Sequence, residues 1–258
     1  MNHAGKESYY ATTFLHSAGE SLQSQIKQRL FAIGFLFAVF AVSLILFYQA
    51  AFLDKNSIAM WAWGILGTAA FGGVFFLGKS ADKYWQGWHG EMCARYELEP
   101  LLREGYEILN DVTGENFNID FLVIGPGGIY VVEVKNPSKR SKDDKISFQD
   151  NKIFLNSKRF EKGDPVAQVK KTAYWVSSLL RETHNAKISH IKPVILFPSF
   201  WVEEVLREDV WVLNPKRFVE EHIKHAPKVF TPQEVNSLAS LFKVHMRTLD
   251  KAYQQLNK

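Results

Sequence analysis

The sequence contains very little cysteine, and two long stretches of it have no charged residue. Among 258 residues there is a single cysteine, Cys93. One thiol cannot form an internal disulfide or a cysteine-rich zinc site, which excludes a secreted disulfide scaffold. The chain is 47% hydrophobic and 22% charged, which excludes a largely disordered protein. Its net charge of +4 is compatible with nucleic acid or anionic lipid as a partner but requires neither.

The two charge-free stretches follow one another near the N-terminus. They cover residues 30–53 and 56–78, and only Asp54 and Lys55 separate them. About 20 apolar residues are enough for a helix to cross the ~30 Å hydrocarbon core of a bilayer. Both stretches therefore predict membrane-spanning helices joined in a tight hairpin. Two buried core helices of a soluble protein are the alternative, but charge-free stretches of this length are rare in soluble cores.

Basic residues flank the outer ends of the two predicted spans. Lys27 and Arg29 precede the first span, Lys79 and Lys83 follow the second, and the connecting loop contains only Lys55. Because cytoplasmic flanks carry an excess of Lys and Arg, we expect a multi-pass protein of the cell (inner) membrane with both termini in the cytoplasm. Neither span has an ionisable residue, which favours an anchor over a transport path.

The chain is expected to have three parts. Residues 1–28 would form a polar cytoplasmic leader, residues 29–78 the transmembrane hairpin (spans at about 30–53 and 57–78), and residues 79–258 a soluble domain. Patterns in this last part predict helices at 81–98 and 165–181, and strands at 106–109, 118–124, 129–135, 146–149, 153–155, 193–197 and 210–213. Asn214-Pro215 and the capping box Thr231-Pro232-Gln233-Glu234 begin two further helices. Strands in the middle with helices on both sides predict an α/β domain with a mixed sheet.

A predicted β-hairpin around Gly125-Pro126-Gly127-Gly128 has unusual polar residues. Symmetric pairing across this turn places Ile124 opposite Ile129 and, further along, Asp120 opposite Glu133. Opposed residues point to one face of a sheet, and Lys135 projects from that face too. Two opposed carboxylates repel each other, and protonation of one or a cation between them would relieve that repulsion. Oxygen ligands of this kind favour Mg²⁺ or Mn²⁺; the structural alternative is a buried Lys–Glu pair that fixes the register.

Several segments of this region resemble the nuclease-related domain family, NERD. They are Gly90-Glu91, then ILNDV, then NIDFLVIGPGGIYVVEVKNPS, then Pro165-Val166-Ala167-Gln168. The resemblance covers roughly residues 88–200. It implies a divergent PD-(D/E)xK nuclease with a restriction-endonuclease-like αβββαβ core. Two departures stand out: Ile119 takes the place of a proline before Asp120, and EVKNPS lacks the more usual aromatic and glycine after EVKN.

The resemblance also implies a set of catalytic residues. Asp120, Glu133 and Lys135 would form the active-site triad, Glu91 would add an acidic group from the first helix, and Gln168 a polar group from the following helix. As a hypothesis, one Mg²⁺ (or Mn²⁺) would be held by Asp120, Glu133 and the backbone carbonyl of Val134. Lys135 would position the attacking water and stabilise charge on the phosphate.

A basic stretch follows the second strand of the hairpin. Residues 135–171 contain 11 basic and 5 acidic residues. A solvated face is the ordinary explanation of such a stretch, but here it adjoins the predicted site, and it would contact nucleic-acid phosphates without reading sequence. The residues expected to do so are Lys139, Arg140, Lys142, Lys145, Lys158, Arg159, Lys170 and Lys171.

The sequence thus predicts a membrane-anchored, metal-dependent nuclease acting on nucleic acid, with DNA the expected substrate. A homodimer would suit an enzyme that cuts both strands. The alternative is a membrane-tethered nucleic-acid-binding or scaffold module on the same fold that has lost turnover. His222 and His225, three residues apart on a predicted helix, could share a metal, but no third ligand of the right kind lies near them in the sequence.

Overall fold

The computed structural model describes residues 20–53, 55–114, 117–160, 163–184, 190–203, 205–206 and 209–256. The described part divides into two compact units, Ser21–Trp88 and the residues from His89 onward. Most of the leader predicted for residues 1–28 lies outside the described residues.

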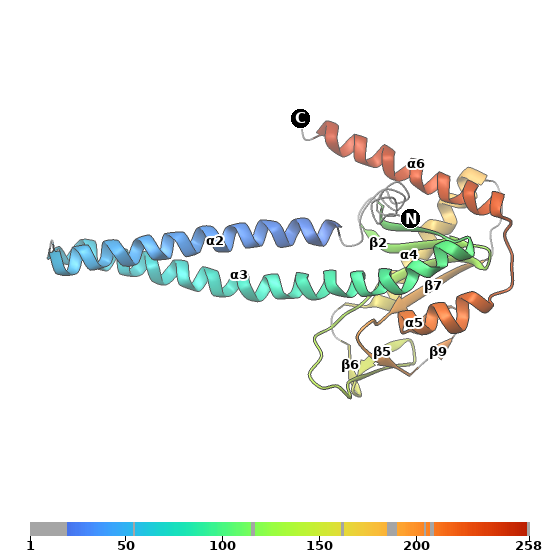
Figure 1. Ribbon diagram of the computed structural model, residues 1–258, viewed down its shortest axis with the longest axis horizontal. Helices are drawn as coiled ribbons and strands as arrows, with labels where there is room; N and C mark the ends of the chain where they lie inside the picture. Colours follow the sequence, from blue (N-terminus) through green and yellow to red (C-terminus); the bar gives the residue numbers. More distant parts are fainter. Residues whose placement is uncertain are drawn as a thin grey trace, which may run out of the picture. The chain divides into compact units, whose positions relative to one another are not determined.

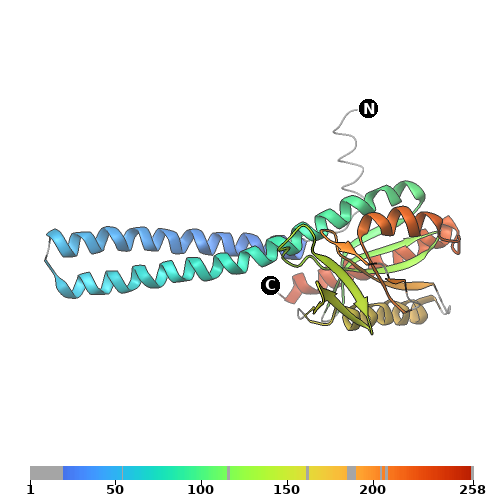
Figure 2. The same ribbon diagram turned by 90° about the horizontal axis from the view of Figure 1, so that it is seen from below.

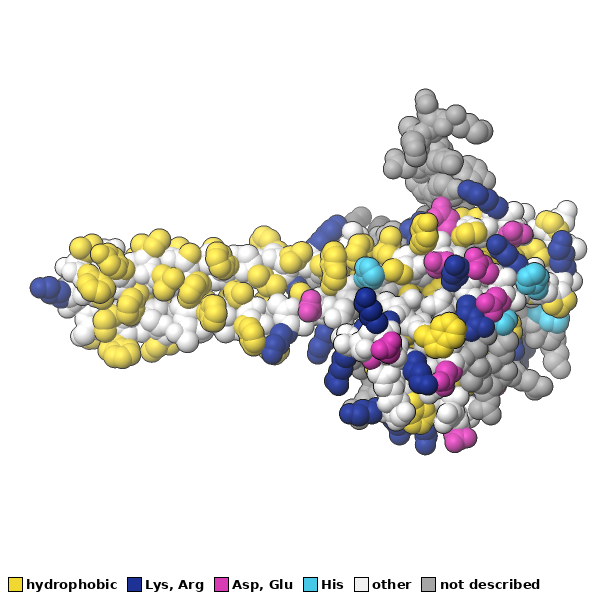
Figure 3. Space-filling view, turned by 60° about the horizontal axis from the view of Figure 1, so that its bottom comes forward, with side chains coloured by type: hydrophobic (Ala, Val, Ile, Leu, Met, Phe, Trp, Pro, Cys, Tyr) yellow, Lys and Arg dark blue, Asp and Glu magenta, His cyan; other side chains and the backbone are white. Residues whose placement is uncertain are grey.

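The first unit is a pair of long helices (Figure 1). Helix α2 (Glu20–Tyr48) ends in a π-helical turn, η1 (Gln49–Leu53), and helix α3 begins at Ser57. Both helices are long and apolar enough to cross a membrane. Their hydrophobic side chains point outward: Phe31 is 80% exposed and Ile58 82%. Figure 3 shows hydrophobic side chains covering the outside of this unit. The alternative of two buried core helices is therefore wrong for the described structure.

Helix α3 (Ser57–Leu98) is one continuous helix of 42 residues. The sequence predicts a span to residue 78 and a separate helix from residue 81. No proline interrupts the residues between them, and Lys79, Ser80 and Ala81 are all compatible with a helix. The α-helix ends at Leu98 and is followed by the 3₁₀ turn η2 (Glu99–Glu104), which contains Pro100 and is capped by Gly105 with a φ of 83°.

The second unit is built on a mixed six-stranded sheet with the strand order β1-β2-β3-β7-β10-β9. The strands are β1 (Glu107–Thr113), β2 (Asn118–Gly125), β3 (Gly128–Val134), β7 (Ile191–Leu196), β9 (Val205–Leu206) and β10 (Trp211–Leu213). The pairs β3–β7 and β7–β10 are parallel and the others antiparallel. With α3 before β1 and α4 between β3 and β7, the chain follows the predicted αβββαβ order.

Helices cover both faces of this sheet (Figures 1 and 2). On one face, α4 (Pro165–His184) and α6 (Pro232–Leu256) pack on a core that includes Leu122 and Ile195. On the other, the end of α3 packs with the segment α5 (Pro215–Arg217), η3 (Phe218–His222) and η4 (Ile223–His225). The α/β class with helices flanking a mixed sheet is confirmed.

The predicted hairpin register is confirmed. The pairs run from Gly125–Gly128 at the turn to Phe121–Val132. Tyr106 stabilises the turn, because its hydroxyl accepts a hydrogen bond from the Gly127 amide at 3.1 Å. This register fixes where the polar residues at the end of β3 emerge.

A small second sheet has the order β6-β5-β4-β8. It consists of β4 (Lys145–Gln149), β5 (Lys152–Leu155), β6 (Lys158–Arg159) and β8 (Trp201–Val202). Its two tight turns, at Asp150-Asn151 and Asn156-Ser157, use positive φ angles that Asn and Asp tolerate. The strands predicted at 146–149 and 153–155 are confirmed, and they pair as an antiparallel hairpin.

The predicted start signals of the C-terminal helices are also confirmed. The Asn214 side chain accepts a hydrogen bond from the Lys216 amide. Thr231 and Glu234 form the reciprocal capping box before α6. The first of these helices, however, keeps α geometry only over Pro215–Arg217 and continues as π and 3₁₀ turns.

Candidate active site

The polar residues of the hairpin emerge at the C-terminal end of β3. This strand is buried along its whole length between β2 and β7. Glu133 is only 3% exposed, and its neighbours on the strand are apolar. A buried carboxylate in a central strand costs free energy unless it is paired or hydrogen-bonded.

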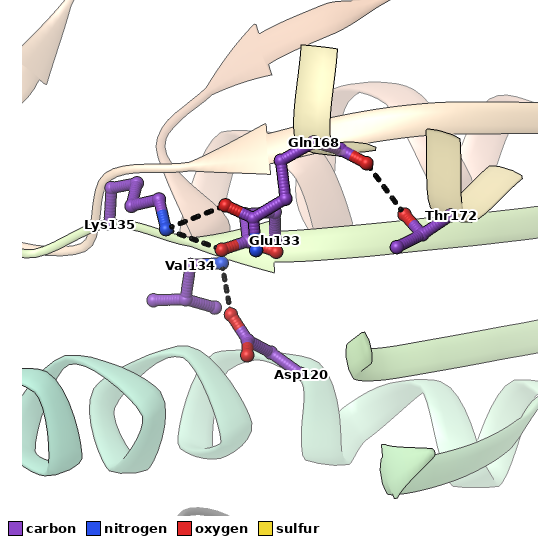
Figure 4. Close-up of polar contacts among 6 residues, drawn as sticks. All are labelled: Asp120, Glu133, Val134, Lys135, Gln168 and Thr172. Atoms are coloured by element: carbon purple, nitrogen blue, oxygen red, sulfur yellow. Dashed lines mark hydrogen bonds and ion pairs between the residues drawn. The ribbon is translucent and has the colours of Figure 1, made fainter. Parts of the chain in front are cut away.

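Lys135 is the partner of that carboxylate. Its Nζ donates to Glu133 Oε1 at 2.5 Å and to Gln168 Oε1 at 3.2 Å (Figure 4). Gln168 lies in the first turn of α4, where Asp164 caps the helix by accepting from the Ala167 amide at 3.0 Å. The structure therefore brings together three predicted site residues from two elements that are distant in the sequence.

Asp120 reaches the same strand through its backbone. One of its carboxylate oxygens accepts a hydrogen bond from the Val134 amide at 2.6 Å. The β2–β3 ladder ends at the pair Phe121–Val132. If the ladder continued, the Val134 amide would donate to a backbone carbonyl of β2; here it donates to the Asp120 carboxylate. In Figure 4 the Asp120 carboxylate approaches β3 from the side away from Gln168. Asp120 thus lies beside the end of β3 and is not paired directly across from Glu133 as predicted.

A local irregularity in β1 accompanies this arrangement. The β1–β2 pairs include Asn110–Phe121 and Val112–Ile119 but skip Asp111 and Asp120. Asp111 has a φ of 46°, a left-handed conformation that Asp tolerates better than most residues.

Burial and neighbouring charge act together on the two carboxylates. The pKa of Asp120 is raised well above its usual range by desolvation, then by the charge of Glu133 and then by that of Glu91. The hydrogen bond from the Val134 amide and the charge of Lys135 lower this pKa but do not offset the rise. Burial also raises the pKa of Glu133, while Lys135 opposes the shift. The site therefore resists holding several negative charges unless more positive charge is present.

Glu91 joins the site through α3 and is itself only 8% exposed. The residue before it, Gly90, packs directly on the end of β3. A Cβ at this position would lie 2.4 Å from the Cβ of Asn136, closer than any real contact. Position 90 therefore requires a glycine, because only then can the part of α3 that carries Glu91 pack so closely on the end of β3.

The donor set fits a single Mg²⁺ or Mn²⁺ by its chemistry. Among the residues that the structure describes, no group of three or more His, Cys, Asp and Glu side chains has metal-binding geometry. Asp120 and Glu133 offer two carboxylates with raised pKa values, which a divalent cation would relieve. Mg²⁺ keeps several waters and needs only one or two carboxylates from the protein.

The eight predicted phosphate-binding residues differ in the contacts that they make in the structure. Lys145 and Lys170 are engaged in ion pairs with Glu203 and Asp209, each at 2.5 Å. Lys139 donates to the Ser199 carbonyl, and Lys142 and Lys171 are exposed. The other three line a groove of about 710 Å³; they are Arg140, Lys158 and Arg159.

Asp144 and Asn156 hold this groove in shape, and the sequence analysis missed both. The Asp144 carboxylate is buried and accepts from the Arg140 amide and the Asn156 side chain, each at 2.7 Å. These hydrogen bonds lower the pKa of Asp144, with the Arg140 amide contributing most. The signal in the sequence was Asn156-Ser157, a turn pair. The groove begins at Pro137 and Ser138, directly after the residues of the site.

Comparison with known proteins gives one match. Residues 86–198 match the family model described as the nuclease-related domain, NERD. No curated protein and no solved structure matches the chain. The matched residues include Glu91, Asp120, Glu133, Lys135 and Gln168. Residues 86–198 therefore resemble the nuclease-related domain family, and the predicted resemblance is confirmed.

Proposed function

We propose that this protein is a membrane-anchored, metal-dependent nuclease that hydrolyses phosphodiester bonds of nucleic acid, with DNA the substrate class to test first. The observation that carries the proposal is the cluster at the end of β3. There Lys135 contacts both Glu133 and Gln168, and Asp120 bonds the amide between Glu133 and Lys135. A plain core strand does not end in such a group of polar side chains.

Each residue of the cluster has a role in this proposal. Asp120 and Glu133, with the carbonyl of Val134, would hold the cation. When bound, a divalent cation supplies Lewis-acid polarisation of the phosphate and lowers the pKa of a water ligand. Lys135 would turn its ammonium group from Glu133 toward the phosphate and stabilise the charge that develops there. Gln168, fixed in the capped first turn of α4, would orient Lys135, and Glu91 would adjust the charge at Asp120.

The groove lined by Arg140, Lys158 and Arg159 would hold the nucleic-acid backbone. Phosphate contacts of this kind position a strand without reading its sequence. Lys139, Lys142 and Lys171 could add weaker contacts, whereas Lys145 and Lys170 would first have to leave their carboxylate partners. We therefore expect the affinity for nucleic acid to fall as the salt concentration rises, and the three groove residues to set most of the slope.

The helical hairpin would anchor this domain in the inner membrane, with both termini in the cytoplasm. Support comes from the outward-facing apolar side chains and from the basic residues that flank the pair of helices. Arg29 and Lys79 illustrate the latter: Arg29 lies over the Tyr84 ring at 3.9 Å and Lys79 over the Phe75 ring at 4.4 Å.

An inactive binding or scaffold module is the second candidate. It is favoured by one observation: in the described residues Lys135 already neutralises Glu133, and no cluster of three or more metal-binding side chains is formed. Such a site could be a stable ion pair that needs no metal.

A cleavage assay on the full chain in detergent micelles separates the two candidates. Plasmid DNA, single-stranded DNA and RNA would be offered with Mg²⁺, Mn²⁺ or EDTA. We expect metal-dependent cutting that Lys135→Ala abolishes while DNA binding remains, and a matched change far from the site, Lys224→Ala, should leave both unchanged. Cutting by Lys135→Ala at the wild-type rate would refute the assignment. Folded protein that binds DNA but cuts none of the substrates would favour the scaffold candidate.

A further inference from the structure

A second pocket lies at the opposite end of β3 and β7 from the candidate active site. Ile129 pairs with Ile191 where these parallel strands begin, whereas Glu133 pairs with Ile195 near their end. The pocket has a volume of about 550 Å³. Its walls come from the β2–β3 turn, the start of β7, β10 and the segment η3–η4.

Side chains that carry or can gain positive charge line this pocket. They are His190, Lys192, His222 and His225. Imidazole is the side chain that ordinarily gains its proton between pH 8 and 5. Figure 3 shows a group of histidine side chains on one part of this unit's surface. Among the described residues, these imidazoles are not part of any group of three or more His, Cys, Asp and Glu that could hold a metal ion.

The acidic side chain and the phenol in the wall of the pocket each have a partner of their own. Glu221 is held by Arg217, whose Nε lies 3.1 Å from both carboxylate oxygens, and this lowers the pKa of Glu221. Burial raises the pKa of Tyr130, so its hydroxyl stays neutral and donates to the Gly127 carbonyl at 3.2 Å. The lysine and imidazole donors of the pocket therefore suit an anion.

Aromatic rings form another part of the wall. The half-buried Trp211 indole has its centroid 6.0 Å from the Tyr130 ring and 5.7 Å from the His222 ring, and Lys192 Nζ lies 5.4 Å from it. The volume falls within the ~300–1,000 Å³ of sites for organic ligands. A bare phosphate would leave most of that space empty, so the walls suit a planar ring joined to a phosphate.

We propose that this pocket binds a nucleoside monophosphate. Its phosphate would lie among Lys192 and the three imidazoles, and its base would pack against the rings of Trp211 and His222. The proposal is independent of the nuclease activity, because none of these residues belongs to the site at the end of β3.

Calorimetric titration of the full chain in detergent micelles with EDTA tests the proposal. The ligands would be AMP, adenosine and inorganic phosphate at neutral pH. We expect saturable binding of AMP that is about tenfold weaker in Lys192→Gln and in His225→Gln, since each removes a charge-assisted contact. Lys224→Gln, which removes a neighbouring lysine outside the pocket, should bind AMP as the wild type does.

Comparison of the three ligands separates the role of the cations from the role of the rings. Absence of saturable AMP binding, or equal loss in Lys135→Ala, would overturn the proposal. Phosphate binding as tight as AMP binding would contradict the role of the rings, and equally tight adenosine binding would contradict the role of the cations. Circular dichroism of each variant checks that it is folded.

Discussion

The two units of this chain use the same apolar residues in opposite ways. Phe121 in the unit that contains the six-stranded sheet is completely buried, whereas Phe31 in the helical hairpin is 80% exposed. Burial of apolar surface is worth about 25 cal/mol per Å² in water, and a soluble protein rarely leaves a large apolar surface uncovered. The comparison teaches that each unit is folded for a different solvent: water around the domain and, on our proposal, lipid around the hairpin.

The largest effect that we expect is the difference in domain stability between alanine substitutions of these two phenylalanines. Phe121→Ala should lower the free energy of unfolding of the domain by about 3–5 kcal/mol, because it leaves a cavity in a fully packed core. Phe31→Ala should leave the domain unchanged. Hydrogen exchange of β2 and β3 amides in the full chain measures both. Equal loss of protection in the two variants would show that the units do not fold separately.

A second contrast uses two valines of similar exposure. Val42 in α2 is 52% exposed and Val244 in α6 is 60% exposed. If lipid surrounds α2, Val42→Arg should cost about 2.5–3.5 kcal/mol of membrane insertion, whereas Val244→Arg should cost nothing measurable. The fraction of protein resistant to carbonate extraction from membranes reports the difference. Full retention of Val42→Arg would contradict a spanning helix.

Two glycines of α3 provide a third contrast. A Cβ at Gly72 meets nothing within 4 Å, but one at Gly90 collides with Asn136. We expect Gly90→Ala to destabilise the domain by about 1–3 kcal/mol and to lower activity, because the end of β3 must shift. Gly72→Ala should be tolerated. Thermal denaturation and cleavage rate together check this, and an active, fully stable Gly90→Ala would show that the close approach does not matter.

The smallest effect concerns Asp120. Its raised pKa means that the folded protein keeps a proton the unfolded chain has released, so metal-free stability should fall as the pH rises from the ordinary pKa of Asp to the raised one. Asp120→Asn keeps an acceptor for the Val134 amide but removes the charge. We expect it to gain about 1 kcal/mol at neutral pH without metal and to flatten the pH dependence. A loss of stability would show that the charge itself is needed.

Much of the fold could be predicted from local patterns. Symmetric pairing of the two apolar runs across the glycine-rich turn predicted the register of β2 and β3, and Thr231 with Glu234 marked the start of α6. Strands β8 and β9 could not be predicted, because two residues show no periodicity. The continuity of α3 was missed because the change from apolar to polar sequence near Lys79 alters the surroundings of the helix and not its backbone.

The candidate site was predicted as a set of residues but not as a geometry. Local sequence placed Glu133 and Lys135 on one face, and the structure joins them at 2.5 Å. The bond from the Val134 amide to Asp120 depends on where the β2–β3 ladder ends, beside the left-handed Asp111. The ion pairs of Lys145 and Lys170 join residues 58 and 39 positions apart, so no local pattern could reveal them.

The central claim is that Asp120 and Glu133 are kept together to bind a divalent cation. Calorimetric titration of the full chain with Mn²⁺ at pH 7.5 tests it most directly, with Glu133→Gln as the comparison. The account predicts one bound Mn²⁺ per chain in the wild type, displaced by Mg²⁺ and lost in the variant. Absence of Mn²⁺ binding, or equal binding by Glu133→Gln, would contradict it and leave Lys135–Glu133 as a structural ion pair.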